Sequence, residues 1–98
     1  MSKFEKTIVV HVRRREISIK FQGSDKIDTF VLEKVDLGTL VMEGHDVVRL
    51  TVTVYDSQGY IHDKIYDNEQ VIVNGQTTIP IHYKFRQEGD YTVHIVVE

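Results

Sequence analysis

Apolar and polar residues alternate with a period of two along most of this chain, and residues 88–98 show the pattern most clearly. After a glycine turn, an apolar row follows at Tyr91, Val93, Ile95 and Val97. Because successive side chains of a β-strand point to opposite faces, this row predicts a strand with one buried and one mostly polar face. The same period recurs through the sequence and predicts an all-β protein.

Turn-forming residues divide the alternating pattern into eight or nine short strands. They are expected at residues 7–13, 16–22, 27–35, 39–42, 48–55, 60–66, 71–73, 77–85 and 91–97. The phase of the apolar row changes between the first two, which predicts a bulge or a bend there. Strands at this spacing predict an antiparallel β-sandwich of about eight strands, with a small β-barrel as the alternative.

Two turn sequences and one proline predict where strands are connected and where a sheet edge lies. Asp56 and Gly59 occupy the first and fourth positions of an expected type I turn. Asn74-Gly75 predicts a second hairpin, with residues 74–76 as its loop. Pro80 cannot donate a ladder hydrogen bond, so it is expected at a sheet edge or a bulge.

Length and composition indicate one domain over residues 1–98 without covalent or metal staples. A chain of 98 residues is long enough to bury a core. It contains no cysteine, which favours the cytoplasm or a virion over a small secreted scaffold. The sequence shows no signal-peptide pattern and no apolar run of membrane-spanning length, so we expect no membrane contact.

The charge distribution argues against nucleic-acid binding. The formal net charge is −3, and residues 50–98 contain seven acidic but only three basic residues. Proteins that bind nucleic acids neutralise phosphates with Lys and Arg. The one basic cluster, Arg13 to Arg15, is expected to be a solvated edge or bend, with an anion site as the alternative.

A resemblance supports the sandwich prediction. The segment Gln87-Glu88-Gly89-Asp90-Tyr91-Thr92-Val93 resembles the tyrosine-corner segment before the penultimate strand of immunoglobulin-like sandwiches. It is also similar to the G-x-Y-x-V strand of bacterial immunoglobulin-like and PKD-like modules. The resemblance covers about a tenth of the chain, implies a sandwich, and implies no ligand because this fold carries many functions.

The sequence offers no catalytic or cofactor motif. Nucleophile elbows, phosphate-binding loops and zinc-binding helices are absent, and no cofactor is expected. The five histidines are scattered, and most fall on the polar phase of strands. If residues 78–85 and 91–97 formed a hairpin, His82 would face His94, which makes this pair the candidate metal or pH-responsive site. The alternative is two separate surface histidines.

The expected hairpin around residues 56–59 gives the main binding candidate. A four-residue loop would pair Tyr55 with Tyr60 and Arg49 with Tyr66 on one polar, ring-bearing face. The candidate binding residues are Arg49, Tyr55, Tyr60, His62, Lys64 and Tyr66. Tyr and Arg are common interface anchors, whereas the alternative is cross-strand packing that only stabilises the hairpin.

The resemblance at the C-terminus also suggests an open sheet edge. If residues 91–97 form a penultimate strand, the position of the last strand beside it is empty. It is then filled by residues 7–12 of the same molecule, by a strand of a second copy or by a partner. The sequence therefore predicts a non-enzymatic interaction or structural module, with self-assembly of the kind found in virion or cell-surface accessory proteins. A carbohydrate-binding module using the tyrosine face and a metal- or pH-responsive binding protein are the alternatives.

Overall fold

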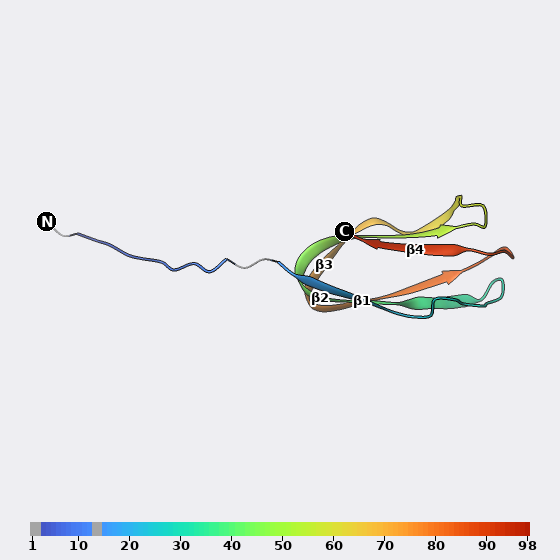
Figure 1. The fold of residues 1–98 in the computed structure, drawn as a ribbon, viewed down its shortest axis with the longest axis horizontal. Coiled ribbons are helices and arrows are strands. Elements are labelled where there is room, and N and C mark those ends of the chain that lie inside the picture. The colour runs from blue at the N-terminus through green and yellow to red at the C-terminus, as the bar shows by residue number, and fades with distance from the viewer. Residues whose placement is uncertain (1–2, 13–14) are drawn as a thin grey trace.

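The computed structural model describes residues 3–12 and 15–98, which form a curved β-sheet and an N-terminal arm (Figure 1). Its strands are β1 (Ile17–Gln22), β2 (Lys34–Tyr55), β3 (Ile61–Lys84) and β4 (Thr92–Val97). All pairings are antiparallel, and β3 runs along one edge of β2. On the opposite edge, β1 pairs with residues 39–44 of β2 and β4 with residues 50–55. β2 is therefore the central strand.

The predicted fold class is wrong beyond its antiparallel all-β character. The described chain contains one sheet of four strands, two of them very long, and neither an immunoglobulin-like sandwich of about eight strands nor a small barrel. The error arose at the glycines. The expected breaks at residues 36–38 and 43–45 lie inside β2, and the expected loop at residues 74–76 lies inside β3. Local turn signals there mark bends within continuous strands.

One hydrogen bond shows how far the sheet folds back on itself. The hydroxyl of Tyr83 donates to Oδ2 of Asp63 at 2.8 Å, although both residues belong to β3. Twenty residues of straight strand would span about 66 Å. The β2–β3 hairpin must therefore bend through its middle, so that its two halves lie face to face (Figure 1).

The core lies between these two halves. Its main cluster comprises Leu37, Leu40, Leu50, Val52, Val54, Ile81 and Phe85, which come from both halves. A second cluster of Met42, Val48 and Val73 lies close to the bend. Residues on one face of a single sheet thus provide both sides of the core.

The bend contains a pair of glycines in register. Gly44 of β2 faces Gly75 of β3, and both have positive φ, 141° and 90°. A side chain at position 44 would also collide with the carbonyl oxygen of Glu16, where the chain enters the sheet. Gly44 is therefore required both by its backbone conformation and by the close approach of residue 16.

The tip of the β2–β3 hairpin forms as predicted. The Gly59 amide donates to the carbonyl of Asp56 at 3.1 Å, as in the expected four-residue turn. The Asp56 carboxylate also accepts hydrogen bonds from the amides of Gln58 and Tyr60. Pro80 lies on β3, which pairs only with β2 in the described part of the chain, so its position in an edge strand is also confirmed.

The N-terminal segment differs from the prediction. Residues 7–12 form no strand and fill no slot in the sheet, whereas Arg13 and Arg14 lie outside the described residues. Residues 3–12 instead form an extended arm that leaves the body near the bend (Figure 1), and the longest dimension of the molecule is 84 Å. Residues 27–33, expected in a strand, form a loop before β2.

We predict that Gly44→Ala destabilises the fold by about 2–4 kcal/mol, because strained backbone and a steric collision add. Gly59→Ala is the matched control. Gly59 has a φ of 86°, but a side chain there would meet no atom within 4 Å, so we expect a loss of only about 1–2 kcal/mol. Urea unfolding of the two variants measures the difference, and equal losses would contradict the role of the contact with Glu16.

Candidate functional site: an acidic groove beside an exposed arm

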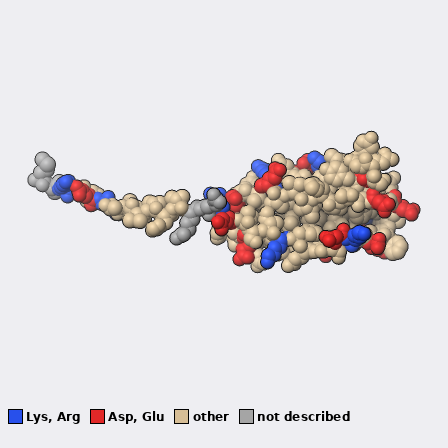
Figure 2. Space-filling model, in the orientation of Figure 1, with Lys and Arg blue, Asp and Glu red and all other residues tan. Residues whose placement is uncertain are grey.

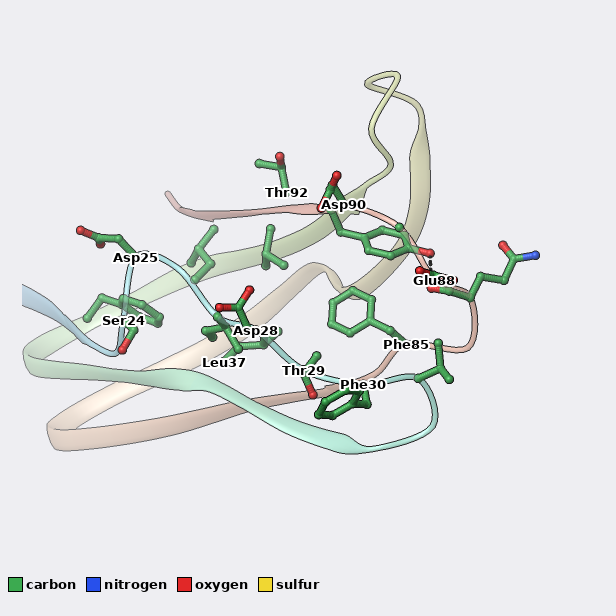
Figure 3. Close-up of a pocket in the computed structure, with 18 residues that line it drawn as sticks. Ser24, Asp25, Asp28, Thr29, Phe30, Leu37, Phe85, Glu88, Asp90 and Thr92 are labelled. Atoms are coloured by element: carbon green, nitrogen blue, oxygen red, sulfur yellow. Dashed lines mark hydrogen bonds between the residues drawn. The ribbon is translucent and has the colours of Figure 1, made fainter.

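A groove of about 980 Å³ opens between the two halves of the sheet (Figure 3). One wall is the loop at residues 24–31, which follows β1. The other is the segment at residues 87–92 with the first part of β4, including Val93 and Ile95. Side chains of Phe21, Leu37 and Phe85 contribute the apolar interior. The groove therefore combines an apolar interior with side chains of β4.

The rim of the groove is acidic. Four carboxylates line it: Asp25, Asp28, Glu88 and Asp90. Figure 3 shows Asp25 near one end, Glu88 near the other and Asp28 between them. Among the described residues that line the groove there is no Lys or Arg. Such a site favours a ligand that is both apolar and positively charged.

Much apolar surface around the groove remains in contact with solvent. Phe30 on the loop is 75 % exposed, and Phe21 on β1 is 44 % exposed. Ile27 and Val31, which line the groove, are also exposed, as are Ile19 on β1 and Leu32 in the loop before β2. Residues 30–32 were expected within a strand at 27–35, so this exposed surface was not predicted. Their continuous apolar run was the signal, but it did not distinguish a buried strand from an exposed loop.

Aromatic rings join the two halves of the sheet beside the groove. The ring of Phe85 packs against Tyr83 and Tyr91, with centroid distances of 4.8 Å in both pairs. Tyr91 also contacts the ring of His62 at 5.0 Å. Its hydroxyl donates to the carbonyl of Gln87 at 2.8 Å, a hydrogen bond typical of a tyrosine corner (Figure 3). This corner forms here without an immunoglobulin-like sandwich.

The hydrogen bond between Tyr83 and Asp63 perturbs the phenol. Burial, followed by the hydrogen bond and the negative charge of Asp63, raises the pKa of Tyr83 from 10.0 to about 12. The folded state therefore holds this proton to higher pH than the unfolded chain does. The resulting stabilisation is fully present below pH 10 and is lost as the pH rises through about 12.

The predicted tyrosine face has a different register. Tyr55 lies opposite Ile61 rather than Tyr60, and Arg49 lies opposite Gln70 rather than Tyr66. The first difference arises at the turn, where the Asp56 amide donates to the carbonyl of Tyr60 at 2.9 Å. Register shifts between Leu50 and Val52, Val52 and Thr53, and Val54 and Tyr55 add to it before Arg49 is reached. Such bulges change which residues face each other and cannot be inferred from loop length.

The six predicted residues also have different environments. Tyr60 is 69 % exposed, whereas Tyr66 packs against the main core cluster. Arg49 donates to the carbonyl of Asn68 at 3.2 Å, and Nζ of Lys64 lies 3.4 Å from a carboxylate oxygen of Asp67. His62 contacts the ring of Tyr91, and Tyr55 is half-buried. A binding role for any of these residues stays a prediction.

The predicted histidine pair does not form. His82 lies opposite Asp36 and His94 opposite Thr53, because β4 pairs with β2 rather than β3. Across residues 3–12 and 15–98, no group of three His, Cys, Asp or Glu side chains is arranged to hold a metal ion. The same residues contain no helix long and apolar enough to cross a membrane.

Comparisons of this chain with protein families, curated proteins and solved structures give no match. The functional interpretation therefore rests on the arm, the groove and their chemistry.

Tyr83 gives a direct spectroscopic prediction. Absorbance titration of the folded protein should show one tyrosine that ionises near pH 12, and Tyr83→Phe should remove this component. Asp63→Asn should lower the pKa only part of the way, because burial is the larger cause. Tyr60→Phe, at an exposed position, is the control that leaves the component in place. If the component near pH 12 persisted in Tyr83→Phe, its assignment to Tyr83 would be contradicted.

The two candidate tyrosines should differ in their effect on stability. Tyr66→Ser removes a ring from the core margin, so we expect a loss of about 2–4 kcal/mol. Tyr60→Ser changes an exposed side chain and should alter the free energy of unfolding by at most about 0.5 kcal/mol. Thermal and urea unfolding measure both values. Equal effects would mean that Tyr66 does not pack as observed.

Proposed function

We propose that this protein is a non-enzymatic structural or interaction module that assembles with further copies of itself through its N-terminal arm. The observation that carries the proposal is the exposure of the arm's large apolar side chains. Phe4, Ile8, Val9, Val10 and Val12 are all 71–89 % exposed. Contiguous apolar surface of this kind is typical of a segment that is covered by a partner.

Magnitudes indicate what the partner must provide. Complete burial of five such side chains contributes about 7–15 kcal/mol, at roughly 1.5–3 kcal/mol each. Ordering the ten backbone units of residues 3–12 costs about 10–20 kcal/mol. Apolar burial alone does not exceed this cost, so the partner must also supply backbone hydrogen bonds or opposite charge. A sheet edge with nearby carboxylates supplies both.

Charge favours a second copy as that partner. Residues 1–16 contain five basic and two acidic residues, whereas residues 17–98 contain seven basic and thirteen acidic residues. The N-terminal sixteen residues, which include the arm, are thus positive and the rest of the chain is negative, and Figure 2 shows acidic groups on the visible face of the body with basic groups among them. Opposite charge accelerates and orients the association of two such molecules.

The alternative functions have less support. A carbohydrate platform requires several exposed rings on one surface, but Tyr66 packs against the core and Tyr60 stands at the hairpin tip. A metal or pH response through the predicted pair requires His82 and His94 to meet, and they lie on different parts of the sheet. The exposed arm has no role in either alternative.

Sedimentation of the full chain tests the proposal. We expect the average mass to increase with protein concentration, and Ile8→Asp/Val10→Asp to remain monomeric because the substitutions place charge in the apolar row. Thr7→Asp/His11→Asp is the matched control, since it adds the same two charges on the alternate positions and should still associate. Wild-type protein that is monomeric at every concentration would overturn self-assembly.

A further inference from the structure

Three strands have an edge without a partner in the described chain, and they differ as acceptors. β3 has the longest edge, but it carries Asp63, Lys64, Asp67 and Glu69, a positive-φ residue at Asn68 and a proline at position 80. Charges, irregular backbone and proline are the features that protect edges from pairing. β1 contains Lys20. Among the strands of the described residues, β4 alone contains no charged residue and no proline.

We propose that the groove along β4 is the acceptor site, and that the arm of a second copy adds there as a further strand. This inference rests on the proposed self-assembly and names the site through which it occurs. Backbone hydrogen bonds between the arm and β4 would contribute the additional free energy that apolar burial of the arm does not provide. The arm's apolar row then enters the groove and covers the exposed side chains of its loop wall.

The dimensions of the two partners agree. Residues 3–12, fully extended, span about 33 Å, and the six residues of β4 span about 20 Å. The arm is therefore long enough to follow β4 completely and to pass both of its ends. Its row of Ile8, Val10 and Val12 has the same period and length as the row of Val93, Ile95 and Val97 on β4. Both rows are β-branched throughout, which favours close packing on a pleated surface.

The charge of the arm is complementary to that of the acidic rim. Two lysines lie at the start of the arm, at positions 3 and 6, and Nζ of Lys3 lies 2.8 Å from a carboxylate oxygen of Glu5. The sequence continues after the apolar row with three arginines at positions 13–15, and a guanidinium nitrogen of Arg15 lies 3.6 Å from a carboxylate oxygen of Asp46 on its own β2. Asp25 and Glu88 lie toward opposite ends of the groove, with Asp28 between them (Figure 3). A strand with lysines in its first part and an apolar centre complements this rim.

Cysteine cross-linking tests the site directly, because the native chain contains no cysteine. Val10→Cys in the arm is mixed, as a full-length protein, with Val31→Cys in the loop wall of the groove. Mild oxidation should give a disulfide-linked heterodimer, identified by mass spectrometry. Ile72→Cys on β3 is the matched control, since Ile72 is 68 % exposed and Val31 46 %. We expect several-fold less heterodimer with Ile72→Cys.

Charge reversal is the second measurement. Asp28→Lys/Glu88→Lys should weaken self-association about tenfold, because two attractive contacts with the arm become repulsive. Asp67→Lys/Glu69→Lys on β3 makes the same change in net charge outside the groove and should leave association unchanged. Circular dichroism of each variant verifies that the fold is retained.

Each outcome separates the acceptor site from assembly itself. Preferential cross-linking to Ile72→Cys, in a protein that self-associates, would overturn the groove and leave the proposed function intact. No heterodimer, together with a monomeric wild type, would overturn both. A disulfide that forms only within the Val10→Cys/Val31→Cys double variant, and never between mixed single variants, would assign the groove to the chain's own arm and overturn the exchange between copies.

Discussion

The bend at Gly44 and Gly75 is the constraint on which the rest of the structure depends. A single sheet of four strands has two faces, and a flat sheet of this size would leave both in water. Folding the β2–β3 hairpin through its middle places the inner faces of its two halves against each other. The buried leucines and valines of the main cluster therefore pack across the fold rather than against a second sheet. The hydrophobic stabilisation of the protein requires this one change of direction.

Interactions at the opposite end hold the folded sheet closed. The hydrogen bond between Tyr83 and Asp63 joins two parts of β3 that are distant along the strand. Phe85 and Tyr91 add ring contacts between the segment after β3 and the segment before β4. The same closure creates the groove, since Phe85 and Tyr91 form part of its lining. Core, closure and candidate site are thus consequences of one geometry.

The sequence predicted local features better than connectivity. Alternation identified the antiparallel β class, and Asp56 with Gly59 identified the hairpin tip, because these signals depend on a few neighbouring residues. Asn74-Gly75 misled the prediction, since positive φ at glycine serves a bend within a strand as well as a tight turn. Only the pairing of Gly75 with Gly44, a partner 31 residues away, distinguishes a bend within a strand from a tight turn at this position.

The candidate site was predicted only in part, for a related reason. The open edge near the C-terminus and the possibility of strand exchange followed from the resemblance of residues 87–93 to the segment before a penultimate strand. The groove did not, because its walls come from segments that meet only after the sheet bends. The arm was assigned to a strand because an unpaired strand has the same alternation as a paired one.

The hairpin also determines how the chain can fold. Sequence separation within the β2–β3 ladder grows from six residues at Tyr55–Ile61 to fifty at Lys34–Lys84. Pairing that begins at the tip closes only short loops at each step, which keeps the entropic barrier low. The core, however, needs Leu50 and Val52 from the near half and Leu40 and Ile81 from the far half. Pairing must therefore extend beyond the bend before these apolar side chains can be buried. The hairpin formed up to that point has no core of its own, and the whole sheet folds as one cooperative unit.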